Sequence, residues 1–135
     1  MIAIFAAAAG ILLTPPEPNR VLSAAMVART LDLTTFDNST SPRRKAGHRT
    51  PADYGFTIVD GDRSLALLSP KDRTWELSVE LISQSGDEVI ICFGDNARDG
   101  GTYHVQQPIA LHHELNGLYR ALPDRPPVPS CPAKS

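Results

Sequence analysis

Cysteine is scarce in this chain, and its scarcity limits what the protein can be. The 135 residues contain two cysteines, Cys92 and Cys131, with no CxxC pair and no third cysteine. Structural zinc sites usually combine four Cys or His ligands, so a zinc module is not expected here. In an oxidising compartment the two cysteines are expected to form a disulfide. The alternative is one buried and one exposed free thiol.

Motifs for catalysis and metal binding are also missing. The sequence has no GxSxG and no P-loop, and neither cysteine has an obvious activating histidine. A calcium loop starting at Asp95 would need an oxygen ligand at position 97 and a glutamate at position 106. The sequence has Ala97 and Gln106 there, so it does not match a calcium loop. The adjacent His112 and His113 would point to opposite faces of a strand, so they are not expected to bind one ion together. We predict no catalytic residue, no metal and no cofactor, which favours a protein that is not an enzyme without deciding the point.

No apolar run is long enough to cross a bilayer, which takes roughly 20 residues. The longest, residues 1–13, has the length of the apolar core of a signal peptide, although no Lys or Arg precedes it. Two alternatives remain open: a short apolar helix of the fold, or a wrongly assigned start with a longer leader. We expect export to the periplasm or secretion, with no transmembrane span after processing.

The charge distribution argues against nucleic acid as a partner. The net charge is −2, whereas nucleic-acid-binding domains are usually basic. The segment PRRKAGHR is the exception, with Arg43, Arg44, Lys45 and Arg49 inside seven positions. The net charge of −2 becomes −6 when these four positive charges are set aside. This basic loop could contact a lipid headgroup, a polysaccharide phosphate or an acidic protein, and its alternative role is that of a solvated loop.

Proline marks the ends of the chain and suggests its organisation. Most of the twelve prolines lie near the two ends. We predict a signal peptide over 1–13, a proline-rich linker over 14–18, and one domain over 19–122. Residues 123–135 then form a proline-rich tail, tied down by the Cys92–Cys131 bridge.

The first part of the domain is predicted to be a helix followed by an irregular segment. Asn19 can cap a helix over 20–31, where apolar residues recur at helical spacing. Residues 34–54 are rich in Ser, Thr, Asn and charge, with Phe36 and Tyr54 as the obvious apolar anchors. Irregular segments of this length are often functional or mobile.

From residue 55 the pattern predicts antiparallel strands. WELSVELIS alternates, and EVIICF is apolar on both faces, as in a central strand. Asp60-Gly61 and Asn116-Gly117 are two-residue hairpin turns in this prediction, and the second pairs His113 with Arg120. TYHVQ and PIALHHEL are expected as separate strands.

These patterns predict an α+β fold in which an N-terminal helix packs on an antiparallel meander of about 6–7 strands, cone-like or half-barrel. A β-sandwich is the second choice. We expect an exported, non-catalytic binding module whose contact surface is the basic loop. The alternative is a small-ligand pocket, or a small isomerase or hydrolase, on the concave face of the sheet. Trp75, Tyr103 and His104 are the pocket candidates, with His104 expected to point away from the core.

Overall fold

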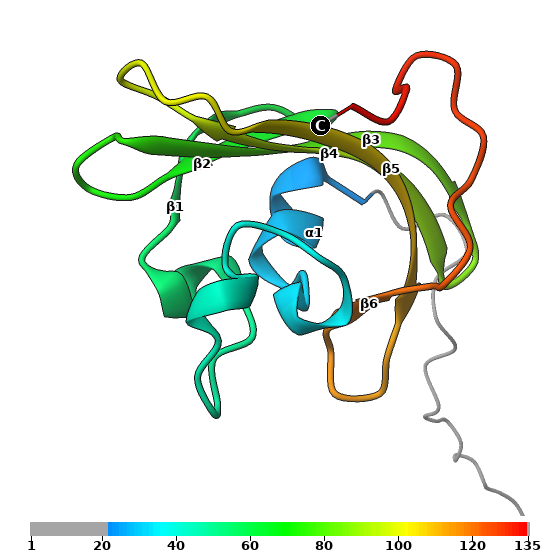
Figure 1. Cartoon of the computed structure of the whole chain (residues 1–135). Helices are drawn as coiled ribbons and strands as arrows, with labels where there is room; N and C mark the ends of the chain where they lie inside the picture. Colours follow the sequence, from blue (N-terminus) through cyan, green and yellow to red (C-terminus); the bar gives the residue numbers. More distant parts are fainter. Residues whose placement is uncertain (1–21, 135) are drawn as a thin grey trace, which may run out of the picture.

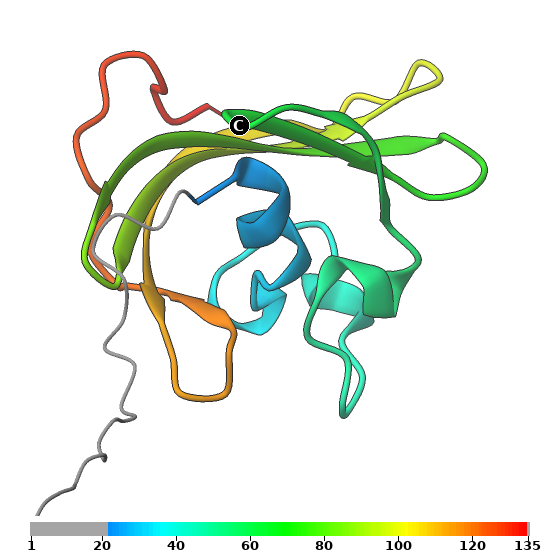
Figure 2. The ribbon, with the colours of Figure 1, turned by 180° about the vertical axis from the view of Figure 1, so that it is seen from behind.

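The computed structural model of the chain describes residues 22–134, which are built around one antiparallel sheet (Figure 1). Its strands lie side by side in chain order, and the sheet curls without closing (Figure 2). They are β1 (Thr57–Gly61), β2 (Leu65–Ser69), β3 (Trp75–Ser85), β4 (Glu88–Ala97), β5 (His104–His113) and β6 (Tyr119–Ala121). The predicted antiparallel sheet is confirmed, and with one short helix the fold is broadly α+β. The signal peptide and linker predictions lie outside the described residues.

The two central strands, β3 and β4, supply much of the buried face of the sheet. Leu77 and Val79 on β3 are almost fully buried, as are Val89, Ile91 and Phe93 on β4. Alternate residues of a strand share a face, so these side chains form one continuous apolar surface. The helix and the irregular segment lie on the concave side of this sheet (Figures 1 and 2).

The helix α1 (Ala24–Arg29) is much shorter than the predicted 20–31. It begins after Ser23, whose hydroxyl accepts a hydrogen bond from a first-turn amide, while the predicted cap, Asn19, lies outside the described residues. Val27 and Ala28 are fully buried in the same apolar cluster as the strand residues. The helix ends early because Leu31 is already extended and forms a parallel bridge with Tyr119 of β6.

The irregular segment that follows contains three short 3-10 turns, η2 (Leu33–Thr35), η3 (Ser41–Arg43) and η4 (Pro51–Tyr54). Side chains satisfy much of its backbone. The Asn38 amide donates to the carbonyl oxygens of Leu33 and Phe36, at 2.8 Å each, and its own oxygen accepts from the backbone and hydroxyl of Thr40. A buried loop needs such partners, because an unpaired backbone group away from water is costly.

The expected strands TYHVQ and PIALHHEL are one continuous strand, β5, with Pro108 inside it. A proline inside a strand is unusual because it removes a hydrogen-bond donor from the sheet. Pro108 pairs with Cys92 of β4 without a shift in register. The strand tolerates proline here because the backbone nitrogen of Pro108 points to the outer edge of β5 and not to β4.

The hairpin between β5 and β6 differs from the predicted two-residue turn. The Gly117 amide donates to the Glu114 carbonyl at 3.0 Å, and the Glu114 amide donates to the Leu118 carbonyl at 2.8 Å. Gly117 has φ of 88°, so the loop is a three-residue turn that ends in a left-handed glycine. His113 consequently pairs with Tyr119, and Arg120 pairs with His112.

The first hairpin also turns later than predicted. Gly61 belongs to β1, and the turn begins at Asp62, whose amide donates to the Leu65 carbonyl at 2.8 Å. The Asp62 carboxylate accepts from the backbone amides of Ser64 and Leu65, at 2.8 Å and 2.9 Å. These hydrogen bonds to the Asp62 carboxylate stabilise a turn at Arg63-Ser64, three residues downstream of the predicted Asp60-Gly61 turn.

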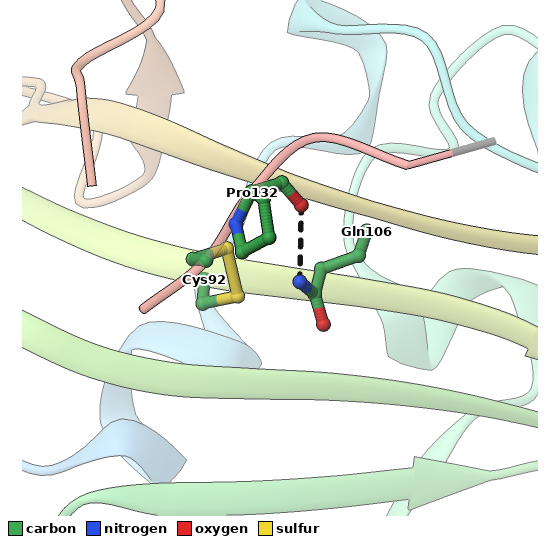
Figure 3. Close-up of a disulfide and its surroundings, with 4 residues drawn as sticks. Cys92, Gln106 and Pro132 are labelled. Carbon is green, nitrogen blue, oxygen red and sulfur yellow. Dashed lines mark hydrogen bonds between the residues drawn. A yellow bond between two sulfur atoms is a disulfide. The ribbon is translucent and has the colours of Figure 1, made fainter. Parts of the chain in front are cut away.

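The predicted disulfide is confirmed, and it ties the C-terminal tail to the sheet. Cys92 and Cys131 are bonded, with Cα atoms 5.7 Å apart, and both are buried. Figure 3 shows Gln106 beside this bond, where its side-chain amide donates to the Pro132 carbonyl at 3.0 Å. The tail therefore runs back across the face of the sheet opposite α1 (Figure 1).

Candidate functional site

The basic loop between η3 and η4 projects away from the sheet, at the bottom of Figure 1. Arg43, Arg44, Lys45 and Arg49 are all exposed, but they differ in what they contact. Two of these cations, Arg44 and Arg49, also hold the loop in place.

Arg44 and Arg49 bond to the body of the protein. The Arg44 guanidinium donates to the carbonyl oxygens of Leu33 and Phe36, at 3.1 Å and 2.8 Å. Arg49 forms an ion pair of 2.6 Å with Asp32, whose side chain is 5% exposed. The nearly buried carboxylate of Asp32 thus balances the positive charge of Arg49. The positive charge of Arg44 is not balanced in this way, because its acceptors are neutral carbonyl oxygens.

The far end of the loop is held by a reciprocal cap on η4. The Asp53 carboxylate accepts from the backbone amides of Arg49 and Thr50, at 2.8 Å and 3.0 Å. Hydrogen bonds from these two amides lower the pKa of Asp53. The His48 ring packs edge-on against Tyr54, with ring centroids 5.5 Å apart. Both ends of the loop are therefore fixed by contacts with the segments that flank it.

The outward positive charge of this loop comes from Arg43, Arg44 and Lys45, which are consecutive and exposed, although Arg44 is also an anchor. Among the ion pairs of the described residues, none joins Arg43, Arg44 or Lys45 to a carboxylate. Such a row of charges raises the local concentration of anions and speeds their association.

Two of the three pocket candidates come together at one corner of the concave face. The Trp75 and Tyr103 rings lie 5.4 Å apart, tilted by 44°. The Trp75 indole N–H donates to the carboxylate of Asp95 at 2.7 Å. Asp95 is fully buried and also accepts from the backbone amide and the hydroxyl of Ser39, at 2.7 Å each. This network joins β3, β4 and the irregular segment.

The chemistry of this corner is that of a fixed scaffold. Burial, followed by the charges of Asp95 and Asp37, raises the pKa of Tyr103, so the phenol holds its proton more tightly than a free tyrosine does. The third candidate, His104, is exposed and lies 3.3 Å from the amide oxygen of Asn96, its partner across β4 and β5. In the strand alternation it shares a face with Asn96 and Gln106, opposite that of Tyr103.

Two hollows in the surface lie away from these side chains. One, of about 250 Å³, lies between the 35–37 segment, β5 and residues 121–125. The other, of about 440 Å³, is lined by Pro108 and the tail from 125 to 133. Neither hollow is lined by Trp75, Tyr103 or His104. The concave face beneath the central strands is filled by the apolar cluster.

Two buried carboxylates, Asp95 and Asp32, have structural roles that were not predicted from the sequence. From the sequence, Asp95 was weighed as the first position of a calcium loop, yet it is the next core-facing position after Phe93 on β4. The alternation Val89, Ile91, Phe93, Asp95 was visible in the sequence and would have placed this carboxylate inside. Nothing local marked Asp32, whose partner Arg49 is 17 residues away.

Within 22–134, no three His, Cys, Asp or Glu side chains are grouped so as to hold a metal ion. No helix in that range is long and apolar enough to cross a membrane. The chain matches no protein-family profile, no curated protein and no solved structure.

Proposed function

We propose that this chain is an exported, non-catalytic binding module that contacts an anionic surface through its basic loop. The observation that carries the proposal is the row Arg43, Arg44 and Lys45, exposed on a loop that is anchored to the rest of the protein near both ends. The proposed ligand class is a surface with dense negative charge, of which a phospholipid headgroup layer and a phosphate polymer are two sources.

The anchoring supports binding because it lowers the cost of ordering. A flexible loop loses conformational freedom on contact, whereas a loop that is already fixed loses little. Arg49 is used for this purpose through Asp32, and Arg44 through two backbone carbonyls. The remaining acidic charge of the chain favours an orientation in which this loop alone faces an anionic surface.

The competing pocket hypothesis has less support. A small-ligand site on the concave face needs unoccupied space and converging polar groups. The polar atoms of Trp75 and Asp95 are bonded to one another, and His104 lies on the other face. Export is supported by the Cys92–Cys131 bond, which persists in oxidising compartments.

The test compares two double variants with equal loss of charge. Arg43→Gln with Lys45→Gln removes two loop cations and leaves Arg44 and Arg49 in place. The control, Arg63→Gln with Lys71→Gln, removes two exposed cations from the turns on either side of β2. Binding is measured by vesicle sedimentation, with equal parts of phosphatidylglycerol and phosphatidylcholine, at increasing salt.

The loop variant should bind these vesicles about thirtyfold more weakly, at about 1 kcal/mol for each lost cation. The control should change much less, and wild-type binding should fall as salt screens the charges. Inorganic polyphosphate serves as a second probe that carries phosphate without lipid. Binding to vesicles alone would identify a membrane surface, and binding to both would identify charge as the recognised feature. Failure to bind either probe at low salt, or an equal loss in the control, would overturn the proposal.

A further inference from the structure

The outer edge of β5 is only partly covered by its neighbour. β5 runs from His104 to His113, but the register pairs β6 with Leu111, His112 and His113 alone. An edge strand left in this way presents unpaired backbone groups that other strands can bind.

The chain closes much of this edge with two separate contacts. At one end, the Leu122 amide donates to the Ala110 carbonyl at 2.8 Å. At the other end, Gln106 and Lys134 exchange two backbone hydrogen bonds, of 3.0 Å and 2.8 Å. The C-terminal tail thus returns as a single antiparallel bridge on the β5 edge.

Pro108 lies between these two contacts, on the outward-bonding series of the strand. Alternate residues direct their backbone groups to the same edge, and Gln106 and Ala110 both bond outward. Pro108 shares their parity, so the amide hydrogen that it lacks would have faced the uncovered part of the edge. Proline at this position removes a donor that no neighbouring strand uses.

The disulfide is what keeps the returning tail in place. Cys131 is fully buried, whereas most of the tail before it, residues 123–130, is exposed. In the described structure the hydrogen bonds of residues 132–134 with the sheet are the backbone bridge of Lys134 and the bond from Gln106 to Pro132. A few hydrogen bonds alone would not offset the entropy of ordering this exposed tail.

We propose that residues 131–134 are a guard strand that prevents the β5 edge from pairing with the β5 edge of a second copy of this chain. A second copy is the natural occupant, because two antiparallel edges related by a two-fold axis are self-complementary. In this arrangement His104 pairs with the second copy's Gln106, and Gln106 pairs with the second copy's His104. Both residues direct their backbone groups to the outer edge of β5, and the pairing does not need the amide that Pro108 lacks.

The test removes the disulfide from the full chain with Cys92→Ser and Cys131→Ser, which gives the open variant. Sedimentation velocity over a range of protein concentrations measures self-association, and circular dichroism checks that the sheet remains. Wild type should sediment as a monomer throughout, whereas the open variant should shift towards a dimer as its concentration rises. An open variant that is folded and monomeric at every concentration would overturn the proposal.

Two further substitutions in the open variant identify the surface involved. Gln106→Pro removes an outward amide without touching the bonds to β4, so it should restore the monomer. Val59→Lys places a charge on the opposite edge strand, β1, and should leave the dimer intact. A dimer that survives Gln106→Pro, or dissociates with Val59→Lys, forms by another surface and contradicts the proposal.

If the open variant does not fold, Lys134→Pro in the disulfide-bonded chain tests the proposal instead. Loss of the Gln106–Lys134 bridge should then cause self-association, and a monomer at every concentration would refute the proposal.

Discussion

Replacing Asp95 of β4 by asparagine should destabilise the protein far more than the same change at Asp99, in the loop between β4 and β5. Asp95 is fully buried and accepts three hydrogen bonds, two from Ser39 and one from Trp75. The asparagine keeps one acceptor oxygen, but its NH₂ group must face one set of these donors. A buried donor is then left without a partner.

Two opposing effects decide the magnitude. Removing a buried charge recovers part of its desolvation cost, which is why buried ionic groups are not always stabilising. Against this, hydrogen bonds to a charged group contribute about 1.5–3 kcal/mol each, and a stranded buried donor costs about 1–3 kcal/mol. Because Ser39 and Trp75 remain in place, the loss should win, with a net destabilisation of about 3 kcal/mol.

Urea unfolding followed by tryptophan fluorescence measures this loss directly. Trp75 is the single tryptophan of the chain, and its indole N–H bonds to the substituted group. With a slope of about 2 kcal/mol per molar urea, the midpoint should fall by about 1.5 M. Asp99→Asn is the matched control, since Asp99 is exposed and its positive φ of 54° is tolerated by asparagine. A midpoint for Asp95→Asn within about 0.25 M of wild type would refute the account of this network.

Two further predictions concern the sheet and its last hairpin. Gly94→Ala should destabilise by about 1–3 kcal/mol, because a Cβ there would overlap the Ser78 hydroxyl oxygen. Adding Ser78→Ala should restore most of that loss in the same urea assay, because the Ser78 Cβ lies at 3.5 Å from the added atom. Hydrogen bonds from His112 and then Arg120 lower the pKa of Glu114, so its stabilisation is present above the ordinary glutamate pKa and is lost as pH falls through the lowered value. Glu114→Gln should therefore be less stable than wild type near neutral pH and approach it in acid, and a pH-independent difference would count against this pairing.

The sequence predicted those parts of the fold that depend on short-range alternation. The buried face of β3 follows from Leu77 and Val79, and the central place of β4 follows from apolar residues on both of its faces. The pairing of Cys92 with Cys131 followed from their number and from the expected compartment. These inferences needed no knowledge of distant contacts.

The features that the sequence did not predict are set by contacts between distant segments. α1 is cut short because Leu31 pairs with Tyr119, which lies far along the chain. The strand break expected at Pro108 does not occur, because the missing amide falls on an outer edge, and edge position cannot be read from a local pattern. Asp32 and Arg49 were not recognised as a pair for the same reason.

The same irregular segment fills the concave face and carries the basic loop, and this links stability to the proposed function. Ser39 joins the segment to β4 through Asp95, while Asp32 and Arg49 join its two ends. Loosening either contact would free the loop without removing any of its outward cations. If binding depends on charge alone, Asp95→Asn should leave vesicle affinity unchanged while it lowers stability. If the fixed geometry of the loop contributes, the affinity should fall in the folded variant as well, and the salt dependence, set by the number of cations, should not change.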